Sequence, residues 1–515
     1  MTETVVSTEG SQERELLGHP IGLAICFLTE MWERFSYYGM RAILIFYLTE
    51  HFLFSAGDAT LIFGTYIGLA YLLPILGGLF ADRYLGSRKA VTYGALLLVA
   101  GHLSLAFEGP TATIVNGAVE RSEDHVSIFY FSLALIITGV GFLKANISTI
   151  VGALYGPNDP RRDGGFTIFY MGINLGSVLA TWAVVAVARA YGWNWGFGLA
   201  GVGMLFGLLV FLWGQKYLDG RAEPKNPAIL KERSPIGLNK EHSIYLLGLG
   251  LVGLMWVMMQ YQELVGKLLG ITGLAMIAII IGYGFLKCEP HERNRLMVAS
   301  FLIMVQSIFW ALFEQQGGSL SLLAKQQFDL VVFGFTILPG QVQTLNPLFV
   351  FILAPIFAWM WVKLANKGLE PSTPAKFGIA MILIGFGYVF FSFGIGLDDS
   401  TEKSFFWMLV IYFFLTTAEL CLSPVGLSMV TKLSVTRIVG MVMGTWFLFT
   451  SLGNYASGVI GKIAGGTSHS VEDSALLDVA ATIDVFNTVG IMSMGVGVVL
   501  LVLTPLMKKY MHGVH

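Results

Sequence analysis

Charged residues and cysteines are both scarce in this chain, and each shortage excludes some classes of protein. Asp, Glu, Lys and Arg make up 12% of the 515 residues, against about 25% in soluble globular proteins. Hydrophobic residues make up 55% and the mean hydropathy is +0.70, so the sequence predicts an integral membrane protein. Cys26, Cys288 and Cys421 lie far apart, without the spacing of metal ligands, and we expect them to be buried or unreactive thiols.

Other absences concern function. The net charge is only −2, which gives no reason to expect a nucleic-acid partner. The sequence shows no paired intramembrane histidines, metal-ligand spacing or nucleophile constellation, so we expect neither an enzyme nor a metal site or other cofactor. A selectivity ring typical of a channel is not visible either. The acidic N-terminus lacks the basic start of a cleaved signal peptide, so we expect the first span to be retained.

Hydrophobic segments of membrane-spanning length are abundant. We count about fourteen of them, since a span needs roughly 20 apolar residues. Loops rich in Lys and Arg all fall on one side of the membrane if the N-terminus is cytoplasmic and the number of spans is even. The opposite loops are acidic or neutral, for example around Asp398, Asp399, Glu472 and Asp473. We therefore expect both termini in the cytoplasm.

A polar linker divides the spans into two sets of six, with two additional apolar segments after it. This arrangement is typical of transporters built from two repeated halves, with a site near the middle of the membrane. The expected organisation is a cytoplasmic tail (1–20), a six-helix bundle (21–218), a cytoplasmic linker (219–242), two accessory helices (243–288), a second six-helix bundle (289–508) and a cytoplasmic tail (509–515).

The first span contains an unusual row of charged residues. At about 100° per residue, one face of a helix contains Glu30, Glu33, Arg34, Tyr37, Tyr38 and Arg41. Charges facing lipid are costly, so these side chains must face protein or a water-filled cavity, and such residues usually mark ion or substrate pathways. A purely structural pair of Glu30 with Arg34, spaced i,i+4, is the alternative. It leaves Arg41 without a partner in its own helix.

Several stretches resemble known transporter families. Residues 77–89, Gly-Gly-Leu-Phe-Ala-Asp-Arg-Tyr-Leu-Gly-Ser-Arg-Lys, resemble the loop between spans two and three of the major facilitator superfamily. Residues 30–38, 139–146 and 169–177 together resemble the proton-coupled oligopeptide transporter family, in its bacterial form with two extra helices between the halves. The second half resembles the same family through Trp310, Glu314, Asn346, Pro347, Glu419, Ser423, Pro424 and Trp446.

The resemblance implies an all-α membrane protein with the major facilitator fold: twelve core helices in two six-helix halves plus two extra helices. It also implies a proton-coupled symporter that imports di- and tripeptides across a bacterial inner membrane by alternating access. Its partners would be these peptides, protons and membrane lipid, and the oligomeric state stays open. The alternative is a facilitator-type carrier for another anion such as nitrate. Glu419 argues against it, because a simple anion needs no carboxylate at the far end of its site.

A peptide is a zwitterion, so its site needs cations at one end and an anion at the other. By resemblance, Arg41 and Lys144 receive the peptide carboxylate, and Glu419 receives the amino group. The expected substrate-binding residues are Tyr37, Arg41, Tyr71, Lys144, Tyr170, Asn174, Trp310, Asn346, Glu419 and Trp446.

Proton coupling needs carboxylates whose surroundings change with conformation. The expected coupling residues are Glu30, Glu33, Arg34, Lys144 and Glu314, with pairs between a span-one carboxylate and Lys144 and between Glu314 and Arg41. Some family members have a histidine after a tyrosine early in span two. Here Ile67 follows Tyr66, so that proton site does not carry over. His102 is expected to fill a polar niche in span three. The expected gating or structural residues are Asp82, Arg83 and Arg88.

Overall fold

Long helices dominate the computed structural model, which describes residues 15–156, 158–235, 237–397, 400, 402–466 and 476–513. The first half contains α1 (Ile21–Phe46), α2 (Ala56–Leu72), α3 (Pro74–Phe80), α4 (Gly86–Leu105), α5 (Glu123–Ala153), α6 (Arg162–Tyr191) and α7 (Trp193–Gly214). The short helix α8 (Pro227–Lys231) precedes the accessory helices α9 (Lys240–Gln260) and α10 (Gln262–Lys287). The second half contains α11 (Pro290–Phe313), α12 (Ser319–Gln327), α13 (Leu345–Asn366), α14 (Thr373–Leu397), α15 (Phe406–Leu433), α16 (Val439–Ala464) and α17 (Val479–Tyr510).

Shorter elements join these helices. There are π-helical turns η1 (Tyr47–His51) and η2 (Ala81–Leu85), and 3-10 turns η3 (Gln215–Tyr217), η4 (Glu314–Gly317), η5 (Pro339–Thr344) and η6 (Thr436–Ile438). Three antiparallel hairpins pair β1 (Glu15–Leu16) with β2 (His19–Pro20), β3 (Thr113–Val115) with β4 (Ala118–Glu120), and β5 (Val331–Val332) with β6 (Phe335–Thr336).

The predicted fold class is confirmed. Among the described residues, the long helices number fourteen when α2 and α3, which are separated at Leu73, are counted as one interrupted helix. Eleven segments of the described chain are long and apolar enough to cross a membrane, and one of them, Ala56–Leu105, contains both α2–α3 and α4. The remaining two long helices are α1, with four charged residues, and α16, rich in Gly, Ser and Thr.

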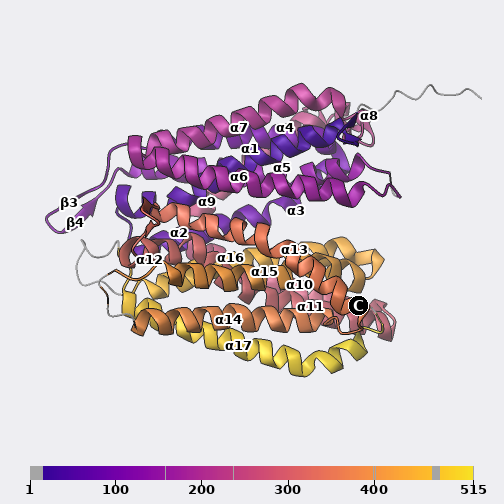
Figure 1. Ribbon diagram of the computed structural model, residues 1–515. Coiled ribbons are helices and arrows are strands. Elements are labelled where there is room, and N and C mark those ends of the chain that lie inside the picture. The colour runs from indigo at the N-terminus through magenta and orange to yellow at the C-terminus, as the bar shows by residue number, and fades with distance from the viewer. Residues whose placement is uncertain are drawn as a thin grey trace, which may run out of the picture.

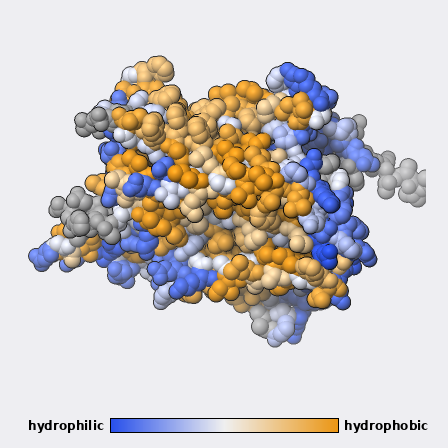
Figure 2. All heavy atoms as spheres, turned by 90° about the horizontal axis from the view of Figure 1, so that it is seen from below, coloured by the Kyte–Doolittle hydropathy of each residue, from blue (hydrophilic) through white to orange (hydrophobic). Residues whose placement is uncertain are grey.

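The long helices run side by side in two groups. In Figure 1 the helices of the first half (indigo to magenta) lie above those of the second half (orange to yellow). Figure 2 shows a broad hydrophobic surface on the lower face, bounded by hydrophilic residues at both ends. Exposed side chains such as Met492, Val498 and Val502 place α17 on the outer surface. An exposed apolar surface with polar ends is what a bilayer requires of an integral membrane protein.

The halves approach each other most closely where α2 crosses α16. Small residues face one another there: a Cβ atom added to Gly64 would lie 2.6 Å from the backbone nitrogen of Gly458. The Ser451 hydroxyl donates a hydrogen bond to the carbonyl oxygen of Gly68 at 2.7 Å. Small residues allow such close backbone contact between membrane helices, where the hydrophobic effect contributes little to packing.

We expect Gly64→Ala to destabilise the protein, because the added methyl group meets rigid backbone rather than a flexible side chain. Overpacking of this kind costs about 1–3 kcal/mol. The measurement is the midpoint of heat-induced aggregation of the detergent-purified protein. Gly198→Ala in α7 is the matched control, because a Cβ atom there meets nothing within 4 Å. An unchanged midpoint for Gly64→Ala would contradict the close contact.

Polar contacts between the halves gather toward one end of the molecule. Lys325 Nζ lies 2.7 Å from Glu50 Oε1, and the hydroxyls of Thr181 and Thr344 are 2.6 Å apart. Both contacts lie far from the end where α1 begins and α17 finishes (Figure 1). The structure is therefore a conformation closed on the side opposite the termini.

The two accessory helices contact different halves. The Trp256 indole of α9 donates a hydrogen bond to the Ser127 carbonyl of α5 at 3.1 Å. In α10, Gly266 and Gly273 lie against the rings of Tyr455 and Phe449 of α16. The hairpin formed by α9 and α10 therefore spans the boundary between the halves on the outside of the molecule.

Parts of the expected organisation are not addressed by the structure. The domain boundaries stay predictions. Residues 1–14 of the expected N-terminal tail and 514–515 of the C-terminal tail lie outside the described residues, as do Asp398, Asp399, Glu472 and Asp473 in the expected acidic loops.

Candidate substrate and proton site

A small polar cavity of about 90 Å³ lies between the two halves. Its walls come from α1, α2 and α6 on one side and from α11, η4, η5, α13 and α15 on the other. The lining residues are Tyr38, Arg41, Tyr71, Ile173, Asn174, Ser177, Thr181, Trp310, Phe313, Glu314, Gln316, Gln343, Asn346, Pro347 and Glu419. Charged groups of both signs therefore face the same space between the halves.

Arg41 and Glu314 join the halves across this cavity. Arg41 Nη2 lies 2.6 Å from Glu314 Oε2, and the two side chains are only 7% and 3% exposed. Arg41 lies on α1, whereas Glu314 begins η4, directly after α11 ends. A charge-assisted hydrogen bond between groups this buried is short and strong, and breaking it leaves a buried charge unpaired.

A second charged cluster lies two turns earlier on α1. Arg34 Nε lies 3.0 Å from Glu30 Oε1 and also contacts Glu33 Oε2. All three side chains are at most 4% exposed. Two carboxylates and one guanidinium leave the cluster with one surplus negative charge, so a further cation or a proton is needed to balance it.

Lys144 supplies a nearby cation but forms no direct ion pair within the described residues. Its ammonium group lies 3.7 Å from the centre of the Tyr71 ring, a cation–π contact. The expected pair between Lys144 and Glu30 or Glu33 is therefore absent from this conformation. Tyr71 lines the cavity, so the ammonium group lies behind the cavity wall.

Glu419 forms the anionic end of the cavity. The Asn346 side-chain amide donates hydrogen bonds to Glu419 Oε2 at 3.0 Å and to the Thr416 hydroxyl at 3.1 Å. These contacts join α13 to α15 and fix the direction of the carboxylate. Within the described residues no cation pairs with Glu419, which leaves it able to receive a positively charged group.

Trp310 and Trp446 are connected through one buried glutamine. The Trp310 indole donates to Gln306 Oε1 at 2.7 Å, and the Gln306 amide donates to the Trp446 carbonyl at 2.9 Å. Trp310 lines the cavity, whereas the Trp446 ring packs against Phe377. In this conformation Trp446 therefore supports the wall rather than forming it.

The structure brings six of the expected substrate-binding residues to the cavity and leaves four outside it. The six are Arg41, Tyr71, Asn174, Trp310, Asn346 and Glu419. The other four are Tyr37, Lys144, Tyr170 and Trp446, and Tyr37 packs beneath the wall against the Arg34 guanidinium and the Tyr66 ring. A role in binding stays a prediction for all ten.

Several lining residues were not predicted from the sequence, although a periodic signal could have found some of them. Ser177 and Thr181 continue the face of Tyr170 and Asn174 along α6, at spacings of three and four residues. Tyr38 lies on the charged face of α1, beside Tyr37, and its ring rather than that of Tyr37 meets the cavity. Gln316 and Gln343 lie in 3-10 turns, where no helical periodicity could place them.

The expected gating residues lie at the end of the molecule where the termini are found. Arg88 donates to both Glu223 oxygens and to Gln215 Oε1, the last at 3.0 Å. Arg83 lies over the Tyr84 ring, and Asp82 is exposed. The first turn of α4 is therefore attached to the linker between the halves, and gating by these residues stays a prediction.

His102 is fully buried in α4, and neither ring nitrogen has a hydrogen-bond partner among the described residues. The polar surroundings that we expected for His102 are therefore not found among the described residues. His102 also does not line the cavity between the halves.

Comparisons with known proteins agree on one family. The model of the POT family matches residues 88–475. An uncharacterized transporter, YclF, of Bacillus subtilis is 37% identical over 512 residues, covering 98% of this chain and 97% of the relative. A di-/tripeptide transporter of Lactococcus lactis subsp. cremoris is 33% identical over 524 residues, covering 96% and 97%. The crystal structure of a variant of the peptide transporter POT in complex with alafosfalin is 35% identical, with a TM-score of 0.82 over 97% of this chain and 98% of that one.

Proposed function

The chain belongs to the POT family of transporters, and we propose that it is a proton-coupled symporter that imports di- and tripeptides by alternating access. The observation that supports peptides as substrates is the cavity with a guanidinium at one end and a hydrogen-bonded carboxylate at the other. The relatives named peptide transporters align along almost the whole chain, which favours this proposal over a carrier for nitrate or another simple anion.

Recognition would use the parts that all short peptides share. Arg41 and Lys144 would attract the carboxylate end of the peptide, and Glu419 would receive the amino end. Tyr71, Asn174 and Asn346 offer hydrogen-bonding groups for the peptide backbone. The cavity measures about 90 Å³ in this conformation, and alternating access would change its size as the halves move.

Coupling would follow from competition for Arg41. A proton on Glu314 removes the charge that holds Arg41, which frees the guanidinium for the peptide carboxylate and loosens the contact between the halves. After release, the charged Glu314 recaptures Arg41 and closes the side opposite the termini. The surplus negative charge of the Glu30–Arg34–Glu33 cluster gives Lys144 a second partner in the same cycle.

We propose a bacterial inner-membrane location with both termini in the cytoplasm. The support is the position of Arg88, Lys89 and the linker at the end where α1 begins and α17 finishes, since positive charge gathers on the cytoplasmic side. Peptides, protons and membrane lipid would be the partners, with the proton as the only coupling ion.

The test is uptake of labelled dialanine into proteoliposomes with and without an inward proton gradient. Accumulation above the external concentration should require the gradient. Unlabelled di- and tripeptides should compete, whereas alanine and tetra-alanine should compete poorly. Competition by single amino acids equal to that by dipeptides would contradict a site with two charged ends, and nitrate competition would favour the alternative carrier.

Glu419→Gln should weaken binding of peptides with a free amino group by about tenfold or more, because a charged hydrogen bond is lost from a buried site. Binding of N-acetylated peptides, which have no charge at that end, should change by less than about twofold. Competition against labelled dialanine measures both affinities. An equal loss for the two peptide forms would remove Glu419 from the amine-binding role.

A further inference from the structure

A second, larger cavity lies entirely within the second half. It has a volume of about 540 Å³ and shares no lining residue with the cavity between the halves. Its walls are the end of α13, the turn that precedes α14, the last third of α15 and the end of α17. The lining residues are Ala365, Gly368, Glu370, Pro371, Ser372, Thr373, Lys376, Pro424, Val425, Ser428, Met429, Lys432 and Lys508. We call it the lysine cleft.

The charge of the lysine cleft is positive. Three of the lining residues are lysines, Lys376, Lys432 and Lys508, and Glu370 is the one carboxylate among the described lining residues. Lys376 is the most deeply placed of the three: its side chain is only 10% exposed, and its ammonium group lies 2.5 Å from Glu370 Oε1. Lys508 reaches the same space from α17.

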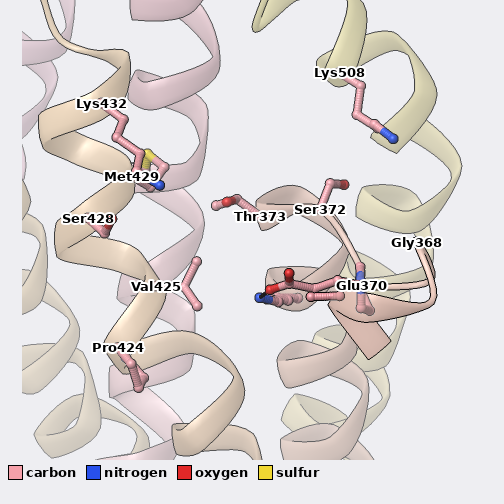
Figure 3. A pocket seen from close by; sticks show the side chains of 13 residues that line it. Gly368, Glu370, Ser372, Thr373, Pro424, Val425, Ser428, Met429, Lys432 and Lys508 are labelled. Carbon is pink, nitrogen blue, oxygen red and sulfur yellow. Dashed lines mark hydrogen bonds and ion pairs between the residues drawn. The ribbon is translucent and has the colours of Figure 1, made fainter. Parts of the chain in front are cut away.

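Hydroxyl groups occupy the space between the cations. Figure 3 shows Ser372 and Thr373 between Lys508 on one side and Ser428 and Met429 of α15 on the other. Ser372 Oγ is buried and has no hydrogen-bond partner among the described residues. The turn also begins α14, a helix of 25 residues whose N-terminal end favours negative charge. Ammonium groups, hydroxyls and a helix N-terminus are the donors that phosphate oxygens accept from.

We propose that the lysine cleft binds a phosphate-bearing anion. Two sources of this chemistry can reach it. One is the headgroup of an anionic phospholipid, because exposed apolar side chains such as Trp359 of α13 and Val502 of α17 place both helices on the outer surface. The other is a free phosphate compound from the aqueous side. Basic pockets between membrane helices on the cytoplasmic side are suited to anionic headgroups. Glu370 competes with the anion for Lys376, so ligand binding and the Glu370–Lys376 pair oppose each other.

The experiment uses the full-length purified protein and two probes. Glycerol 3-phosphate titrated into the detergent-purified protein gives the affinity for a free phosphate compound. Native mass spectrometry of protein mixed with phosphatidylglycerol or phosphatidylcholine gives the preference for an anionic headgroup. Binding of glycerol 3-phosphate alone assigns the cleft to free phosphates, and preference for phosphatidylglycerol alone assigns it to the lipid. Either result supports the proposal, and failure of both overturns it.

Matched variants test the position of the site. Lys508→Gln should weaken binding of the successful probe by about fivefold, whereas Lys509→Gln, its neighbour on α17 outside the cleft lining, should change it less than about twofold. Glu370→Gln should tighten binding, because it removes the competing carboxylate from Lys376. Equal weakening by Lys508→Gln and Lys509→Gln, or no gain in Glu370→Gln, would overturn the proposal. Dialanine exchange should persist in all three variants.

Discussion

Glu314→Gln is expected to separate peptide exchange from proton-driven accumulation. Glutamine has nearly the shape of glutamate and is permanently neutral, so it mimics the protonated state at a position that is 3% exposed. It can no longer attract Arg41 through charge, so the closed contact between the halves stops depending on a proton. Exchange of labelled for unlabelled dialanine across the vesicle needs no net proton movement and should stay within about threefold of the unaltered protein. Accumulation driven by a pH gradient should fall to the level without a gradient.

Glu50→Gln is the matched control for this experiment. Glu50 also pairs with a cation of the other half, Lys325, at 2.7 Å, but the two side chains are 30% and 41% exposed. Exposed pairs of this kind contribute about 0–1 kcal/mol, so neither assay should change measurably. Normal gradient-driven accumulation by Glu314→Gln would show that the coupling proton resides elsewhere. Loss of accumulation in His102→Gln would point to the buried imidazole instead.

The fold could be predicted from the sequence because its signals are local. Each membrane span is an apolar stretch of sufficient length, and the break between α2 and α3 follows from Pro74, which lacks an N–H and starts a new helix. The charged face of α1 was predictable in the same way, from spacing within one helix. Arg41 was therefore placed on the face that meets the cavity before any neighbour was known, whereas Asn174 was expected there by resemblance to the family.

Partners far apart in the chain could not be predicted from spacing. Arg88 lies in a recognisable motif, yet its partner is Glu223 in the linker, 135 positions later. The choice of Tyr38 rather than Tyr37 at the cavity depends on a rotation of about 100° between successive residues, which helix packing decides and the sequence pattern does not. Gln316 and Gln343 reach the cavity from 3-10 turns that have no apolar periodicity.

Contacts that change during transport could not be predicted from the sequence either, and those of Lys144 are an example. The sequence predicted a pair with a carboxylate of span one, whereas the structure places the ammonium group over the Tyr71 ring. A residue that exchanges partners during transport has more than one position, and any one structure shows only one of them. The contacts of Lys325 with Glu50 and of Thr181 with Thr344, on the side opposite the termini, identify which state this is.

Lys144→Ala is expected to abolish proton-driven accumulation of peptide. The expected loss is at least about tenfold, because the lysine provides the charge that alternates between the span-one cluster and the peptide. Removing it leaves the surplus negative charge of Glu30, Arg34 and Glu33 without a nearby cation, so the cluster has no lysine to exchange with the peptide during the cycle. Uptake of labelled dialanine with and without the gradient measures the loss. Lys267→Ala, an exposed lysine of the accessory helix α10, is the control and should accumulate peptide normally.

A double variant distinguishes coupling from simple charge balance. Glu33→Gln removes the surplus negative charge, so adding it to Lys144→Ala should restore any thermal stability that Lys144→Ala loses. It should not restore accumulation, because the moving cation is still absent. Recovery of both stability and accumulation would mean that Lys144 serves only to neutralise the cluster. Full concentrative uptake by Lys144→Ala alone would contradict the exchange of partners and leave Glu314 and Arg41 as the pair through which the proton acts.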